Sequence, residues 1–147
     1  MIILLVMIRF SDDIFLSIRS SISSPVGDCA QAGEEMNVPP VVLSCGFHDG
    51  ALPCAASFAE VADQNVRLGA IKEGQDGSSV VLRLFEVEGL ETEARIALSP
   101  LLIGTGARAV EVDTVERPLE ANGARLEGDT LRVRLPAFGV TTVRVEL

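Results

Sequence analysis

The feature that most constrains this chain is an alternation of apolar and polar residues that begins near residue 64 and continues to the C-terminus. In its first run, Val66, Leu68 and Ala70 recur at every second position. This spacing places alternate side chains on opposite faces of a β-strand, whereas a helix would repeat its apolar residues every three or four positions. The alternation therefore predicts strands that each bury one face.

Turn residues divide the alternating region into short pieces. Asp76-Gly77, Asn122-Gly123 and Gly128-Asp129 have the composition of tight turns, because glycine adopts a positive φ without strain. No helical pattern separates the pieces, so we predict an all-β fold, an antiparallel β-sandwich with an irregular N-terminal segment. The expected strands are residues 66–72, 80–87, 91–98, 109–115, 130–135 and 140–147.

The first part of the chain differs from the rest in composition. Six of the nine isoleucines lie within the first 22 residues. We therefore predict two parts, an atypical apolar segment at residues 1–26 and a β-sandwich domain at residues 27–147. Within the second part, we expect one or two helical turns at residues 28–36, a short strand at residues 41–43 and a loop at residues 47–53.

The opening run MIILLVMI does not have the form of an export or membrane segment. No positive residue precedes it, Arg9 follows it instead, and no convincing small-residue cleavage pattern comes after it. The run is also far shorter than the roughly 20 apolar residues that span a bilayer. We therefore expect a first strand here, no association with a membrane, and a cytoplasmic protein.

The cysteines and the single histidine allow two interpretations. Cys45, His48 and Cys54 form one arrangement for a metal, but the fourth ligand of a structural zinc site is missing from the pattern. Small buried thiols are the alternative that we prefer. With Cys29, the cysteines number three, and an odd count argues against a secreted disulfide framework.

Charge and aromatic content exclude or weaken two classes of function. Twelve basic residues against 21 acidic ones give a net charge of −9, which repels phosphate backbones, so we expect no nucleic-acid partner. Sugar sites commonly use the rings of Trp and Tyr, which are absent here. Phe85 and Phe138 lie in patterns typical of a core. An autonomous carbohydrate-binding module is therefore the weaker alternative, and a protein-interaction module, which would expose apolar surface, is a further one.

Several short motifs keep their order along residues 27–147 and together resemble one family. The central motif is the run at residues 65–73, followed by Asp76-Gly77 and by Leu-Arg-Leu-Phe-Glu at residues 82–86. This region resembles the C-terminal β-domain of glycoside hydrolase family 38, the α-mannosidases. Near the end, Ala137 is inserted relative to the family pattern, and Gly139 replaces an acidic residue. Further matching pieces are residues 35–39, residues 48–53 with Ser57-Phe58, residues 112–116 and residues 135–142.

The resemblance implies that the reaction belongs to another part of the enzyme. In the family, an Asp nucleophile and a bound zinc lie in an N-terminal α/β domain, and a three-helix bundle separates that domain from the β-sandwiches. This chain matches only the last part, so we expect a non-catalytic fragment that supports the catalytic domain and contains no cofactor of its own. The implied partners are the catalytic domain of an α-mannosidase, a second copy of the chain, or mannose-containing glycans.

Three residues are candidates for an interface or a substrate cleft, namely Arg83, Glu86 and His48. Arg83 either lies inside the sandwich or at a domain interface, where a bidentate carboxylate pair would hold it, or it faces water. Retaining glycosidases need two carboxyl groups about 5–5.5 Å apart. Glu86 and Glu88 share a strand face, but a solvated strand edge explains them, so no catalytic residue is expected.

Overall fold

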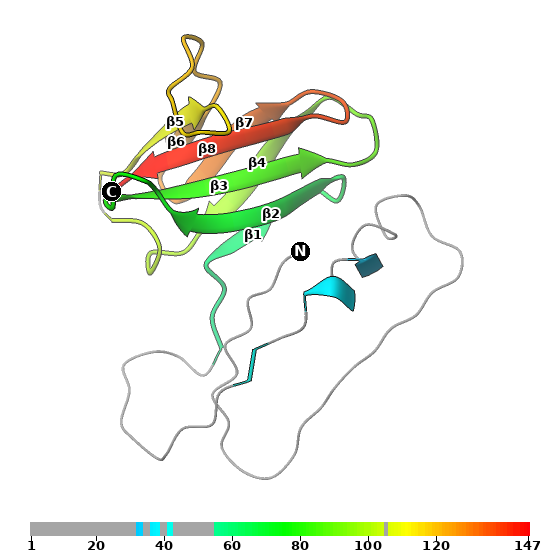
Figure 1. Cartoon of the computed structure of the whole chain (residues 1–147), viewed down its shortest axis with the longest axis horizontal. Helices are drawn as coiled ribbons and strands as arrows, with labels where there is room; N and C mark the ends of the chain where they lie inside the picture. The colour runs from blue at the N-terminus through cyan, green and yellow to red at the C-terminus, as the bar shows by residue number, and fades with distance from the viewer. Residues whose placement is uncertain (1–31, 34–35, 39–40, 43–54, 105) are drawn as a thin grey trace.

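The computed structural model describes residues 32–33, 36–38, 41–42, 55–104 and 106–147. In these ranges, eight strands form two antiparallel sheets of four strands each, which confirms the predicted all-β sandwich. The first sheet has the order β1-β4-β7-β6, and the second has the order β2-β3-β8-β5 (Figure 1). The strands are β1 (Ala59–Val61), β2 (Val66–Glu73), β3 (Ser79–Glu86), β4 (Thr92–Leu98), β5 (Arg108–Val112), β6 (Arg125–Glu127), β7 (Thr130–Leu135) and β8 (Val140–Glu146).

The core lies between the two sheets, on what we call the core face of each. The alternation in the sequence builds it, because every second residue of the central strands points inward. Full burial of one such aliphatic side chain contributes about 1.5–3 kcal/mol. The second sheet contributes Leu82 and Leu84 of β3 with Val143 and Val145 of β8, and the first contributes Ala94, Ile96 and Leu98 of β4 with Leu131, Val133 and Leu135 of β7.

A bulge in β2 changes the predicted faces of that strand. Leu68 pairs with Leu84, but the register shifts at Gly69, and Ile71 then pairs with Leu82. Since residues paired across antiparallel strands share a face, Ile71 returns to the core face, and the predicted place of Ala70 there is wrong. A Cβ atom at position 69 would lie 2.2 Å from the Phe85 ring, so glycine allows this close approach.

Other boundaries also differ from the prediction. The two three-residue strands β1 and β6 were not expected, because a run of that length shows no periodicity. β5 ends at Val112 instead of residue 115, because a turn begins at Asp113. In this turn the carbonyl oxygen of Asp113 accepts a hydrogen bond of 3.0 Å from the Glu116 N–H.

The described residues before the sandwich are few. Residues 32–33 and 36–37 are helical, as expected for the helical turns, whereas Val41 and Val42 are exposed and not in a strand. That strand prediction is wrong at these two positions, since no strand in the described part of the chain pairs with them. Residues 1–26 and the predicted loop at residues 47–53 lie outside the described residues. Within the described part of the chain, no helix is long and apolar enough to cross a membrane.

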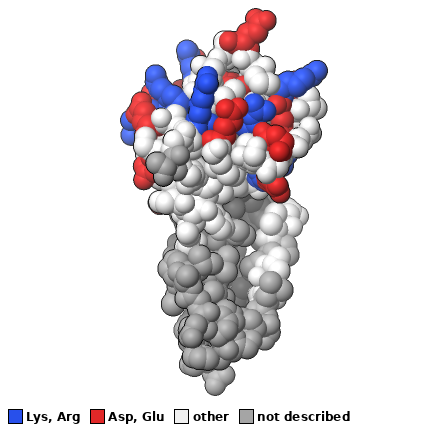
Figure 2. Space-filling model, turned by 90° about the vertical axis from the view of Figure 1, so that its left-hand side faces the viewer, with Lys and Arg blue, Asp and Glu red and all other residues white. Residues whose placement is uncertain are grey.

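The first sheet presents a charged outer face. Arg125 contacts Glu93 at 2.5 Å, and Arg132 contacts Glu127 at 2.7 Å. Positive and negative side chains are likewise interspersed on the side of the sandwich that Figure 2 shows. Mixed charges of this kind are typical of a surface in contact with water.

Replacement of Leu84 tests the described core. We expect Leu84→Ala to lower the free energy of unfolding by about 2–5 kcal/mol, because the lost side chain leaves a cavity between the sheets. Urea-induced unfolding of the whole chain measures this change. The matched control is Leu101→Ala, at an exposed leucine, for which we expect less than about 0.5 kcal/mol. Equal losses in the two variants would contradict this core.

Candidate functional site

Glu86, the last residue of β3, is the most deeply buried acidic residue in the described part of the chain. It follows Leu82 and Leu84 on the core face, and only 3% of its surface is exposed. The prediction of a solvated strand edge is therefore wrong for Glu86. A charged carboxylate removed from water is costly unless hydrogen bonds replace the solvent, so its partners decide what this residue does.

Each carboxylate oxygen of Glu86 accepts two hydrogen bonds. Oε1 accepts from the Asn65 side-chain amide and from the Glu88 N–H, both at 2.9 Å. Oε2 accepts from the N–H groups of Gly89 and Phe138, both at 2.8 Å. The donors belong to the β1–β2, β3–β4 and β7–β8 connections, each of which passes from one sheet to the other. The three connections lie at one end of the sandwich (Figure 1), and the Glu86 side chain joins them there.

These hydrogen bonds set the charge of Glu86. Burial, the largest single influence, raises the pKa of this carboxyl, whereas hydrogen bonds to the ionised form lower it. The bonds from Phe138, Glu88, Asn65 and Gly89 together outweigh burial and lower the pKa of Glu86 to about 2. At neutral pH the side chain is therefore an ionised acceptor and has no proton to donate as a general acid.

The β7–β8 turn holds Phe138 in an unusual backbone conformation. Phe138 has a φ of 52°, in the left-handed region that favours glycine. The turn spans residues 136–139 and is closed by a hydrogen bond of 2.9 Å from the Gly139 N–H to the Pro136 carbonyl oxygen. A bulky residue at such a φ costs on the order of 1 kcal/mol. The bond from the Phe138 N–H to Glu86 helps to offset this cost.

The side chain of Phe138 is on the surface. It is 73% exposed, so its predicted place in a core is wrong; the turn removes it from the alternation of the flanking strands. A Cβ atom at Gly89 would lie 2.6 Å from its ring, which shows how closely the two residues approach. Leu90, beside Gly89, is 56% exposed, and Val140 is 49% exposed. We call Leu90, Phe138 and Val140 the turn patch. Phe85, also predicted to be in the core, is half-buried on the outer face.

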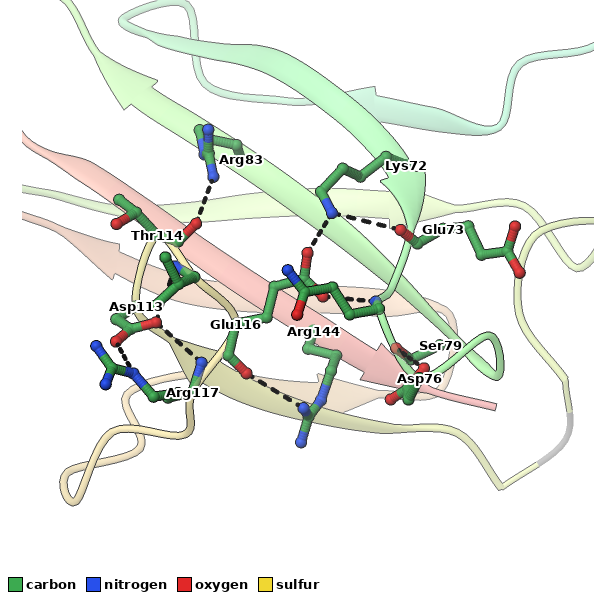
Figure 3. A network of polar contacts seen from close by, with 12 residues as sticks. Lys72, Glu73, Asp76, Ser79, Arg83, Asp113, Thr114, Glu116, Arg117 and Arg144 are labelled. Carbon is green, nitrogen blue, oxygen red and sulfur yellow. Dashed lines mark hydrogen bonds and ion pairs between the residues drawn. The ribbon is translucent and has the colours of Figure 1, made fainter.

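Arg83 lies on the outer face of the second sheet, opposite to Glu86. The structure thus does not bring these two predicted site residues together, and Arg83 is not inside the sandwich. Its Nη2 donates to the carbonyl oxygen of Thr114 at 3.3 Å (Figure 3). Its Nε is buried and has no hydrogen-bond partner among the described residues. A place at a domain interface therefore remains a prediction for Arg83.

A second carboxylate network, at Glu116, was not predicted from the sequence. Glu116 has a φ of 67° and pairs with Lys72, and its Oε2 accepts the Gln75 N–H at 2.7 Å. Its carbonyl oxygen accepts from Arg144 at 3.3 Å (Figure 3). The hydrogen bond from Lys72, followed by that from Gln75, lowers the pKa of Glu116. This network fastens the loop after β5 over the outer face, where Val81 is buried.

The remaining candidates are a histidine, a metal site and a cavity. His48, with Cys45 and Cys54, lies outside the described residues. Among the residues that the structure does describe, no group of three or more His, Cys, Asp or Glu side chains is placed to hold a metal ion. An open cavity of about 470 Å³ lies among strand ends; Phe58, Ile71, Val80, Leu102 and Leu147 are among its lining residues.

Comparison with family models gives one match. Residues 65–145, more than half of the chain, match the model described as the glycosyl hydrolases family 38 C-terminal beta sandwich domain. The match includes β2 to β8 except the last residue of β8, and thus Glu86 and the turn patch. Comparison with curated proteins and with solved structures gave no match.

Loss of the Glu86 carboxylate should destabilise the sandwich strongly. We expect Glu86→Ala to lower the free energy of unfolding by about 3 kcal/mol or more, because several buried donors lose a charged acceptor. Urea-induced unfolding measures the change. Glu88→Gln is the control: its side chain is exposed and its N–H remains, so we expect less than about 0.5 kcal/mol. A mild effect of Glu86→Ala would argue against the four-bond arrangement.

The same residue should give the stability of the chain a specific dependence on pH. Since the pKa of Glu86 is about 2 in the folded chain and 4.5 as an ordinary carboxyl, its contribution is present above about pH 4.5 and is lost as the pH falls toward 2. Unfolding at a series of pH values in this window should show a steeper loss for the unaltered chain than for Glu86→Gln. Parallel curves for the two proteins would contradict the assignment.

Proposed function

The chain belongs to glycoside hydrolase family 38 through its C-terminal β-sandwich domain, and from this membership we propose that the sandwich is a non-catalytic module that packs against the catalytic part of an α-mannosidase-like enzyme. The observation that carries the proposal is the turn patch. It places three apolar side chains on the surface at the end of the sandwich where Glu86 joins the crossings. An apolar patch among polar residues is typical of a surface that meets another protein.

The contrast between the turn patch and the outer face of the first sheet supports this choice of surface. The outer face of the first sheet carries the Arg125–Glu93 and Arg132–Glu127 ion pairs, which suit contact with water. The turn patch carries no such pairs among its members. Since desolvation of charged groups opposes association, the turn patch is the better place for a dry contact.

Rigidity at this end supports the same function. The Glu86 carboxylate fixes the β3–β4 and β7–β8 connections. Leu90 lies on the first connection, Phe138 lies on the second, and Val140 directly follows the second as the first residue of β8. A surface that is ordered before binding loses less conformational entropy when a partner docks. The proposed module would therefore offer a preformed contact to the catalytic part of the enzyme.

Catalysis by the sandwich itself does not fit the chemistry of Glu86. A retaining glycosidase needs one carboxyl with a raised pKa as acid and a second as nucleophile. Glu86 has a lowered pKa, and all four of its hydrogen bonds come from within the sandwich. We therefore assign the reaction, and the zinc expected with it, to the catalytic part of the enzyme.

Carbohydrate binding is the second candidate, and the exposure of Phe138 favours it. An exposed aromatic ring offers an apolar surface on which a sugar ring can stack. The exposure of Phe138 removes one of the two sequence observations against this function, whereas the absence of Trp and Tyr still weighs against it. The ligand would be a mannose-containing glycan, as the family membership suggests.

One binding experiment tests both candidates. The full chain is titrated with the catalytic and helical part of a family 38 α-mannosidase and, separately, with mannose oligosaccharides. We expect a saturable complex with the enzyme part and no saturable binding of the oligosaccharides. Sedimentation of the chain alone controls for self-association. Absence of a complex at tens of micromolar, with the chain folded, would contradict the packing function, and saturable binding of oligosaccharide alone would favour the second candidate.

A further inference from the structure

Two residues other than glycine adopt a positive φ in the described part of the chain, Glu116 and Phe138. At Glu116 the side chain itself compensates for the strained backbone, because its buried carboxylate pairs with Lys72 and accepts the Gln75 N–H. The strained conformation of Glu116 thus stabilises the fold through contacts within the chain. It needs no partner from outside the chain.

Phe138 shows the opposite arrangement. Its side chain is mostly exposed, so the strained conformation gains little burial within the sandwich. The compensating bond comes from its backbone N–H, which donates to Glu86. A glycine at this position would keep that bond and remove the strain. A strained residue that is held by its surroundings while its side chain points to solvent indicates a use for that side chain.

The neighbours of Phe138 indicate the chemistry of the partner. Leu90, which follows Gly89, and Val140, two residues after Phe138, are also exposed apolar residues. Glu88, on the same connection as Leu90, is exposed, and no cation pairs with its carboxylate among the described residues. A partner that covers the patch must therefore be apolar at its centre, with a basic side chain at the rim to meet Glu88.

From these observations we propose that Phe138 is the main docking residue of the sandwich, held in position by Glu86 and inserted into an apolar site on the catalytic part of the enzyme, with a basic residue of that part opposite Glu88. This inference rests on the proposed function and specifies its contact. Apolar aromatic anchors of this kind commonly dominate the affinity of protein interfaces.

The test compares variants of the full chain in titrations against the catalytic and helical part of a family 38 α-mannosidase. We expect Phe138→Gly and Phe138→Asn to bind at least about tenfold more weakly, while their unfolding midpoints stay equal to that of the unaltered chain or rise. Asn also tolerates the left-handed conformation, so it keeps the test valid if glycine loosens the turn. Val115→Ser, at an exposed valine on the loop after β5, is the matched control and should bind normally.

A second variant tests the rim. Glu88→Gln should weaken binding several-fold at low salt, and the difference should shrink at high salt, because salt screens an exposed charge pair. The substitution leaves the hydrogen bond from the backbone N–H of residue 88 to Glu86 unchanged, so the turn stays in place. Equal affinity of Glu88→Gln and the unaltered chain at low salt would contradict the proposal that a basic residue of the partner lies opposite Glu88.

The outcomes separate this inference from the proposed function. If the unaltered chain does not bind, the proposed function fails, and this inference fails with it. If the unaltered chain binds and both Phe138 variants bind equally well, the inference alone is overturned. A lower unfolding midpoint of the Phe138 variants would also overturn the inference, because it indicates a structural role for the side chain. The same holds if the variants lose binding of mannose oligosaccharides but still bind the enzyme part.

Discussion

A charged carboxylate inside a protein must find hydrogen-bond donors, and in this sandwich the donors that Glu86 finds belong to the connections between the sheets. Asn65 adds a further link, because its amide also donates to Thr92 Oγ1, at the start of β4, at 2.6 Å. The end of the sandwich is thus closed by a polar centre instead of by apolar packing. Because the centre requires every donor in place, it also fixes the backbone of the β7–β8 turn.

A buried carboxylate that stabilises a strained backbone occurs twice in the described part of the chain, with different results. Glu116 fastens the loop after β5 over the outer face through its own buried side chain. Glu86 instead fastens a turn whose Phe138 remains on the surface. The first arrangement completes the fold, whereas the second shapes a surface. This difference, rather than the exposure of Phe138 alone, is the physical basis for the docking role that we propose.

The periodicity of the sequence was sufficient for the sandwich and for the positions of β3, β4 and β7, since burial of alternate residues is a local property. It failed where distant contacts decide. The bulge at Gly69 depends on the Phe85 ring across the sheet, and β1 and β6 are too short to show a pattern. Glu86 was selected as a candidate residue, but its burial depends on Asn65 and Phe138, 21 and 52 positions away. Motifs identified the family, while these contacts identified the turn patch.

We infer that the Glu86 carboxylate holds the Phe138 turn in the folded chain. Amide hydrogen exchange at neutral pH tests it most directly, because the Phe138 N–H belongs to an exposed turn yet donates to a buried acceptor. The comparison is the Val115 N–H, which donates to the exposed Asp113 carboxylate. We expect the Phe138 amide to exchange at a rate close to those of the core strands and far more slowly than the Val115 amide. Exchange of the two amides at similar, rapid rates would contradict it.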